Sequence, residues 1–377
     1  MNSKVVRVLH VVDNLSITAG VSSMIMNLYR NIDSQKIIFD FLVGRHVEKN
    51  YESEIESLGG RVYYFGNPLS ARGFISANRK SREFFRANSD KYDIVHLHSP
   101  TICEFTVRYA KQYGIKHIII HSHSSMTSTN RFKSIINSIL QRRVTYLATD
   151  YWACSTEAGS FLFGDKSVKD GKVSIIYNAV STNLYTYNES YRRKMRRELC
   201  LENKLIVTHV AGFFSIKNHS FLLPIIASIK QTAPNIRFVF VGAGPEQESF
   251  IESLKRTNNY DVCSFLGRRD DVYAILQASD LLILPSIKEG LPVTIIEGQA
   301  AGIPCLVSDS ITKDALVNNV TYIPLNTEYW EEYIRDFIPL TNEQRMSKSR
   351  EFEKSHFNII EEAKRVQDKY IELVVEK

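Results

Sequence analysis

Two glutamates, Glu289 and Glu297, carry the most specific chemical signal in this sequence of 377 residues. Glu289 lies in a Lys-Glu-Gly-Leu-Pro loop directly after the apolar run 281–284, and Glu297 lies about one turn into the helix predicted from Val293. A helix N-terminus carries positive partial charge and free N–H groups, so an anion is favoured there. Carboxylates beside such a site can accept hydrogen bonds from sugar hydroxyls. The alternative is that Glu289 is an ordinary surface loop residue and Glu297 a favourable acid in the first turn of a helix, with no ligand.

Lys217 is the candidate partner for a phosphate. It follows the apolar run 205–210 by a short loop and precedes a helix predicted from Ser220. A cation at that place can neutralise a diphosphate. The alternative is a solvated lysine in a loop.

Gly242 and Gly244 stand between a predicted strand and a predicted helix in the run Val-Gly-Ala-Gly-Pro. Glycine lets the backbone approach a ligand closely. The run lacks the full dinucleotide-binding fingerprint, so an ordinary turn explains it equally well.

Five histidines cluster in the first half of the chain, at positions 96, 98, 117, 121 and 123. Residues two apart on a strand share a face, so His96 and His98 could meet His121 and His123 on a neighbouring strand. Zinc needs three or four converging ligands, and no acid joins this pattern. We therefore expect no metal here. Two interpretations remain open: the histidines are hydrogen-bonded structural residues at strand ends, or they belong to an active site.

The elements that must position these residues form two series in which strands alternate with helices. The first series has strands near 5–12, 37–43, 61–65, 94–98, 118–121 and 173–176, and helices near 21–30, 76–88, 104–113 and 131–143. The second has strands near 205–210, 236–241, 262–265, 281–284 and 304–307, and helices near 220–231, 246–257, 271–278 and 293–301. Near-continuous apolar strands that alternate with helices predict parallel sheets covered on both faces.

The fold class is therefore α/β, with two doubly wound Rossmann-like domains that face a cleft. We expect the domains at 1–184 and 185–358, with 185–201 as a polar linker and the terminal helix of 359–377 joined to the first domain or the second. Ligands of open parallel sheets bind beyond the carboxyl ends of the strands, which is where the candidate residues lie.

The chain resembles a known family, the retaining GT-B glycosyltransferases of glycosyltransferase family 4, near the exopolysaccharide and capsule branch. The resemblance covers essentially the whole chain and rests on the Glu-(seven residues)-Glu stretch 289–297 and its continuation to Asp309. It also rests on runs at 8–12, 27–33, 39–41, 92–98, 121–123, 217–219 and 241–245. The resemblance implies the GT-B fold and metal-independent transfer of a sugar from a nucleotide-sugar with retention of configuration, with no further cofactor.

The resemblance also implies roles for individual residues. Glu289 would contact hydroxyls of the donor sugar, Glu297 the ribose and Lys217 the diphosphate. His123 matches the family's histidine beside the reacting sugar, and His98 is a second candidate at the end of its strand. The remaining matched positions are Gly20 in the loop for the donor phosphate, Gly242 and Gly244 beside the nucleotide, and Phe265 and Leu266 at the base.

The chain departs from the family pattern at two places. Gly212 stands where the family has an arginine that clamps the phosphates, and Arg268 or Arg269 is a candidate replacement. In the first domain Ala19 replaces one glycine of the phosphate loop, and a serine takes the place of the acid that follows it. These losses weigh slightly toward a degenerate member of the family.

Three functions remain open on this basis. The leading one is a glycosyltransferase that uses a UDP-sugar as donor and a lipid-linked glycan of a surface polysaccharide as acceptor. The absence of any Asp-x-Asp motif agrees with a metal-free mechanism. The alternatives are a nucleotide-sugar epimerase of similar fold and a non-catalytic partner subunit of another glycosyltransferase.

The composition of the sequence restricts the expected cellular location and the expected binding partners of the protein. The net charge is +6, and the basic excess lies in the first half of the sequence. No nucleic-acid-binding motif appears, no apolar run reaches the roughly 18 residues of a membrane span, and five scattered cysteines suit a reducing cytoplasm. The amphipathic stretch 131–143 and the basic stretch 79–86 predict contact with an anionic membrane surface, although 131–143 would also suit packing on the sheet.

Overall fold

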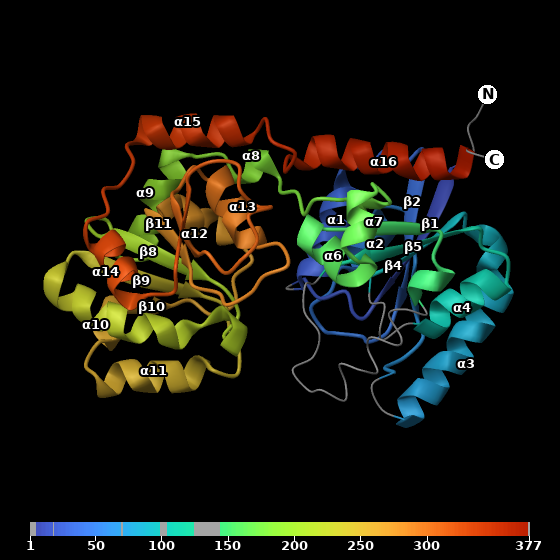
Figure 1. The fold of residues 1–377 in the computed structure, drawn as a ribbon, viewed down its shortest axis with the longest axis horizontal. Helices are drawn as coiled ribbons and strands as arrows, with labels where there is room; N and C mark the ends of the chain where they lie inside the picture. The colour runs from blue at the N-terminus through green and yellow to red at the C-terminus, as the bar shows by residue number, and fades with distance from the viewer. Residues whose placement is uncertain (1–4, 18, 69–70, 99–103, 124–143, 376–377) are drawn as a thin grey trace. The chain divides into compact units, whose positions relative to one another are not determined.

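The computed structural model describes residues 5–17, 19–68, 71–98, 104–123 and 144–375. The chain forms two compact units: unit 1 comprises residues 1–179 and 359–377, and unit 2 comprises residues 180–358. Figure 1 shows a sheet covered by helices in each unit. The division between the units falls after Ala179, five residues before the boundary expected from the sequence. The helix predicted over 131–143 lies outside the described residues.

Unit 1 is built on a seven-stranded parallel sheet with the order β3-β2-β1-β4-β5-β6-β7. Its strands are β1 (Val6–Val12), β2 (Ile37–Val43), β3 (Val62–Tyr64), β4 (Ile94–Leu97), β5 (His117–Ser122), β6 (Asp150–Ala153) and β7 (Val173–Ile175). The chain runs from β1 to one edge and returns to β4 on the other side of β1. This reversal of direction is the place where doubly wound sheets bind ligands.

Helices cover both faces of this sheet. They are α1 (Gly20–Asn31), α2 (Glu52–Ser57), α3 (Ala71–Asn88), α4 (Glu104–Gln112), α6 (Thr156–Phe163), α7 (Asp165–Lys169) and α16 (Ile359–Val375), with a 3₁₀ turn η1 (Ser89–Lys91). Strand β1 divides its side chains between two cores. Val6 and Val8 pack in the core under α1 and α16, and Leu9 and Val11 pack in the core under α3 and α4.

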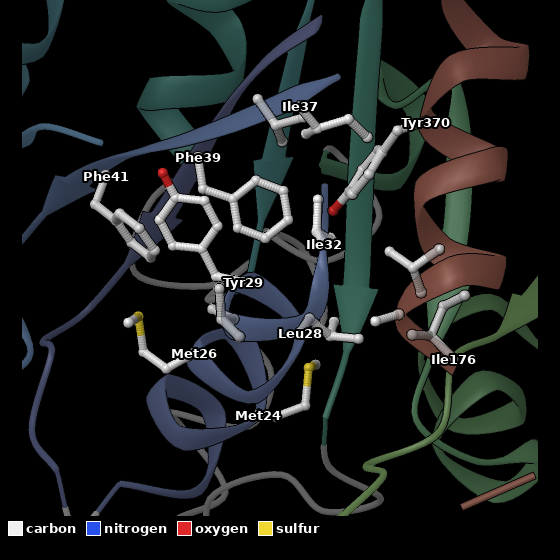
Figure 2. Close-up of a cluster of buried hydrophobic side chains, with 14 of the residues drawn as sticks. Met24, Met26, Leu28, Tyr29, Ile32, Ile37, Phe39, Phe41, Ile176 and Tyr370 are labelled. Atoms are coloured by element: carbon white, nitrogen blue, oxygen red, sulfur yellow. The ribbon is translucent and has the colours of Figure 1, made fainter. Parts of the chain in front are cut away.

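The terminal helix α16 belongs to unit 1. Figure 2 shows Tyr370 of α16 beside Phe39, and the two rings meet edge to face with centroids 5.8 Å apart. Polar contacts add to this packing, because Gln367 accepts a hydrogen bond from the backbone of Asp33 and Glu362 accepts one from Tyr177. The helix therefore closes one face of the first sheet.

Unit 2 repeats the architecture with six parallel strands in the order β10-β9-β8-β11-β12-β13. Its strands are β8 (Leu205–Val210), β9 (Ile236–Val241), β10 (Cys263–Phe265), β11 (Leu281–Leu284), β12 (Cys305–Ser308) and β13 (Val320–Ile323). Its helices are α8 (Thr182–Tyr185), α9 (Glu189–Glu198), α10 (Leu222–Thr232), α11 (Gln247–Arg256), α12 (Val272–Ala278), α13 (Val293–Ala300), α14 (Thr327–Arg335) and α15 (Asn342–Phe352), with 3₁₀ turns η2 (Ser215–Lys217), η3 (His219–Phe221) and η4 (Tyr260–Val262). Here the direction reverses between β8 and β11.

The linker predicted over 185–201 is wrong. Most of that stretch is α9, which packs on α12 within unit 2. Arg192 and Arg196 both pair with Asp280 and donate hydrogen bonds to carbonyl oxygens at the end of α12. The charges that resembled a solvated linker therefore satisfy free carbonyls at the C-terminus of a helix, where cations are favoured.

No helix among the described residues is both long enough and apolar enough to cross a membrane.

Candidate functional site

The loops that follow β8 and β11 form the candidate donor site of unit 2. These strands are hydrogen-bonded neighbours, so their carboxyl ends meet where the sheet changes direction. Lys217 comes from the first loop and Glu289 from the second, and Lys217 Nζ lies 2.5 Å from Glu289 Oε1. The backbone N–H of Ile287 donates to the carbonyl of Ile216 at 2.9 Å and ties the loops together. The structure thus brings two predicted site residues into direct contact.

This ion pair is only partly exposed to solvent. The side chain of Lys217 is 24% exposed and that of Glu289 is 12% exposed. A diphosphate is a stronger competitor for an ammonium group than a single carboxylate, because it offers several charged oxygens. Occupation of Lys217 by phosphate would therefore release Glu289 for another hydrogen-bond donor.

Glu297 lies in the second turn of α13, the helix that follows the loop of Glu289. Its carboxylate accepts a hydrogen bond from the hydroxyl of Tyr185 at 2.6 Å. Burial raises the pKa of Glu297 to about 7, and the Tyr185 hydrogen bond opposes this rise in pKa. Sequence reasoning missed Tyr185, which it placed at the start of a linker. A lone tyrosine 112 positions away from its partner gives no local signal.

Gly242 and Gly244 are required by contacts between loops of the protein itself. Gly242 has φ +137°, and a Cβ added to it would lie 2.0 Å from the carbonyl oxygen of Ala211. A Cβ on Gly244 would lie 2.4 Å from the carbonyl oxygen of Phe213. Both glycines therefore let the loop after β9 pack against the loop after β8, which carries Lys217.

The two candidate replacements for the phosphate clamp, Arg268 and Arg269, are both exposed. Arg269 donates to Asp271 at 2.7 and 2.8 Å. At Gly212, the added Cβ would lie 2.8 Å from the ring of Phe214, which is half exposed. An aromatic side chain thus covers the position at which the family pattern has an arginine.

Phe265 is the last residue of β10, and Leu266 follows it. The ring of Phe265 stacks on Phe240, with centroids 5.1 Å apart, and on Tyr260 at 5.8 Å. The backbone N–H of Leu266 donates to the carbonyl of Phe240, so it is not free for a ligand. The Phe265 ring is thus occupied by core packing.

In unit 1, Gly20 is the first residue of α1. The residue before it, Ala19, provides no side-chain cap for the helix N-terminus, and a Cβ added to Gly20 would meet no atom within 4 Å. The acid position falls at Ser22 or Ser23; the Ser22 hydroxyl donates to the carbonyl of Asn14 at 2.8 Å, and the Ser23 hydroxyl donates to the carbonyl of Ile17 at 3.3 Å. The start of α1 is therefore open and free of acidic side chains.

The predicted histidine cluster exists and contains one more member. His10 of β1 lies opposite His96 in the sheet register and was missed, although its place in the predicted first strand was a usable signal. One chain of hydrogen bonds runs from His10 Nδ1 to His98 Nε2 at 2.9 Å, and from His98 Nδ1 to His123 Nε2 at 2.8 Å. His117, in contrast, takes no part in these contacts.

A second chain of hydrogen bonds joins the terminal helix to the histidine cluster. The hydroxyl of Tyr370 lies 2.6 Å from His96 Nδ1, and His96 Nε2 lies 3.1 Å from His121 Nδ1. Burial lowers the pKa of every one of these imidazoles, to about 3 for His10 and His123. All five rings are therefore neutral at physiological pH.

Comparison with known proteins decides the family. Residues 18–184 match the description "Glycosyltransferase Family 4" and residues 191–357 match "Glycosyl transferases group 1". The putative glycosyltransferase EpsF of Bacillus subtilis is 34% identical over 89% of this chain and 88% of its own length. This chain belongs to glycosyltransferase family 4.

Other glycosyltransferases are similar over much of the chain. The UDP-Gal:alpha-D-GlcNAc-diphosphoundecaprenol alpha-1,3-galactosyltransferase of Escherichia coli is 27% identical over 76% of this chain and 77% of its own length. Among solved structures, Anabaena Alr3699/HepE in complex with UDP and glucose aligns with TM-score 0.77 at 17% identity, over 97% of this chain and 99% of that chain. The predicted family and the predicted GT-B fold of this family 4 glycosyltransferase are confirmed.

Proposed function

We propose that this glycosyltransferase moves a sugar from a UDP-sugar to a lipid-linked glycan acceptor in the synthesis of an exopolysaccharide or capsule, with retention of configuration and without a metal or other cofactor. The observation that carries the proposal is the Lys217–Glu289 pair at the reversal point of the second sheet. A cation for a diphosphate and a carboxylate for sugar hydroxyls stand side by side there, at the usual ligand position of such sheets.

Binding of the donor would exchange the partners of this pair. The diphosphate takes Lys217, which stabilises the negative charge that develops on the leaving group as the glycosidic bond to it breaks. Glu289, freed from the lysine, accepts hydrogen bonds from the donor sugar. Glu297 accepts hydrogen bonds from the ribose, with Tyr185 fixing its carboxylate.

The other proposed contacts follow the family pattern. His123 contacts the reacting sugar, and the open start of α1 at Gly20 contacts donor phosphate through backbone N–H groups. The loop of Gly242 and Gly244 lies beside the nucleotide. The strand end at Phe265 and Leu266 contacts the base, although not through the Leu266 N–H, which is bonded to the carbonyl of Phe240.

UDP as the nucleotide is supported by two relatives. The Anabaena structures contain UDP or UDP-glucose, and the Escherichia coli relative is named for UDP-galactose and a diphosphoundecaprenol acceptor. The second name also supports a lipid-linked acceptor for this chain, and with it a place at the cytoplasmic face of the membrane.

Helix α3 supports contact with an anionic membrane. It exposes two apolar residues, Phe74 and Ile75, the latter with 71% of its surface accessible. Its exposed charged residues are Arg72, Arg79, Lys80, Arg82, Glu83 and Arg86. Basic residues near anionic lipid contribute roughly 1 kcal/mol each. The other proposed contact, 131–143, lies outside the described residues.

Release of UDP from a panel of donors tests the proposal. Release that requires a lipid-linked acceptor identifies a transferase, and a product isomer formed without acceptor identifies an epimerase. No release with any donor and acceptor would favour a non-catalytic partner subunit. In a parallel arm, the wild-type protein should sediment with anionic vesicles at low salt, and replacement of Arg79, Lys80 and Arg82 by Ser should weaken this binding.

A further inference from the structure

The chain His10–His98–His123 has a single direction. A neutral imidazole has one N–H donor and one nitrogen acceptor, and burial keeps these rings neutral. Both nitrogens of His98 are engaged, one with His10 and one with His123. If His98 accepts from one neighbour it must therefore donate to the other. The tautomer of His10 and the tautomer of His123 are thus fixed together.

The surroundings of His10 decide which direction is taken. Its Nε2 is buried and has no hydrogen-bond partner among the described residues. The ring meets Phe39 edge-on, with centroids 4.2 Å apart, and stacks on Phe41, with centroids 5.4 Å apart, and a ring face is at best a weak acceptor. Among backbone groups, a buried N–H without a partner is rarer than a buried acceptor without one, and we apply the same preference to the imidazole nitrogens. The unpaired Nε2 is therefore the bare nitrogen, and the proton of His10 is on Nδ1.

We infer that His98, backed by His10, is a positioning residue that holds His123 as the tautomer with its proton on Nδ1. The hydrogen bonds run outward, from His10 Nδ1–H to His98 Nε2 and from His98 Nδ1–H to His123 Nε2. His123 is half buried, and no described residue bonds its Nδ1. Its Nδ1–H is thereby presented as a donor. In the proposed function, on which this role rests, that donor meets an oxygen of the reacting sugar.

The geometry favours hydrogen bonding over a shared metal ion. Ligand nitrogens of His98, His121 and His123 lie within 4.8 Å of one another, as do those of His10, His96 and His98. Two nitrogens on one tetrahedral zinc, each at about 2.0–2.1 Å, would be about 3.3 Å apart. The facing nitrogens of the first chain lie at 2.8 and 2.9 Å, which is hydrogen-bond distance.

The test reads the tautomer of His123 directly. The full-length protein, labelled with ¹⁵N-histidine, is measured at neutral pH by two-bond ¹H–¹⁵N correlation, which shows the nitrogen that carries the proton. His123 is assigned from the signal lost in His123→Asn. We expect wild type to show only the Nδ1–H form. The Nε2–H form, or a mixture, would overturn the inference.

Two variants of His98 and one matched control complete the test. His98→Leu removes the donor, so the Nε2–H form of His123 should appear. His98→Asn places an amide N–H near the position of Nδ1 and should restore the Nδ1–H form. Tyr370→Phe removes a buried polar group from the second chain and should change nothing at His123. An unchanged tautomer in folded His98→Leu would overturn the inference, as would a Zn²⁺-induced shift of His98 and His123 at stoichiometric metal.

Activity provides the functional readout. For His98→Leu, kcat should fall in proportion to the fraction of molecules whose His123 carries its proton on Nε2, which is about twofold for an equal mixture. His98→Asn should restore kcat. Recovery of the tautomer without recovery of kcat would refute the positioning role. Because the tautomer is read without a donor, failure to find any sugar transfer would count against the proposed function and not against the histidine chain.

Discussion

Replacement of Glu297 by glutamine should stabilise the protein at neutral and alkaline pH while it weakens nucleotide binding. Glutamine has the same shape as glutamate, and its carbonyl oxygen can still accept the hydrogen bond from Tyr185. It cannot ionise, so it avoids the cost of a buried carboxylate. The residue would thus be retained for ligand binding at the expense of stability.

The magnitude follows from the pKa. Burial raises the pKa of Glu297 from 4.5 to about 7 in the folded protein. As pH rises, the unfolded chain therefore ionises first, and stability is lost between pH 4.5 and 7. A difference of 2.5 pKa units corresponds to at most about 3.5 kcal/mol, since each unit is about 1.4 kcal/mol. For a folded unit of this size, that free energy is a shift in melting temperature of roughly 7–14 °C.

Thermal unfolding at pH 8 and pH 4 measures this effect. Glu297→Gln should melt higher than wild type at pH 8, and the two should melt together at pH 4. The exposed Glu332→Gln is the matched control and should differ from wild type at neither pH. An equal gain for Glu297→Gln at both pH values, or no gain at pH 8, would refute the reasoning about burial.

Four further outcomes are expected. Tyr185→Phe should raise the pKa of Glu297 further, because the hydrogen bond that lowers it is lost; a lower pKa in a carboxyl NMR titration would contradict this. Lys217→Ala should weaken UDP binding by roughly 10- to 100-fold, because a charge-assisted contact of about 1.5–3 kcal/mol is removed; equal calorimetric affinity would argue against the phosphate role. Gly244→Ala should destabilise unit 2 by about 1–3 kcal/mol in urea unfolding, because the new Cβ meets the Phe213 carbonyl. EDTA should leave transfer unchanged, and strict dependence on Mn²⁺ or Mg²⁺ would disprove the metal-free mechanism.

The fold was largely predictable because its strands are buried on both faces. Runs such as Leu281–Leu284 are apolar at every position, which is typical of strands in a parallel sheet between two helix layers. The strand Val320–Ile323 was missed because it is only partly buried and carries Thr and Tyr. Helix α9 was misread because Arg192 and Arg196 bind carbonyl oxygens that only the folded structure brings near them.

The candidate site was predictable where one loop carries the signal. Glu289 and Lys217 each follow a strand, and the sheet order makes those strands neighbours. Contacts between distant segments were not predictable, since nothing near Tyr185 or Tyr370 in the sequence points to Glu297 or His96. The direction of the hydrogen bonds from His10 to His123 likewise depends on which imidazole nitrogen is buried without a partner, and only the folded structure shows which nitrogen that is.

The most direct test of the account is to measure UDP binding and sugar transfer on the same preparation of Glu289→Gln. The carboxylate is proposed to contact the sugar and not the nucleotide, and its loss also frees Lys217 from the ion pair. Calorimetry should therefore show UDP affinity equal to or above that of wild type, whereas acceptor-dependent UDP release should disappear. Wild-type turnover in this variant, or loss of UDP affinity together with activity, would contradict the assignment of Lys217 to the diphosphate and Glu289 to the sugar.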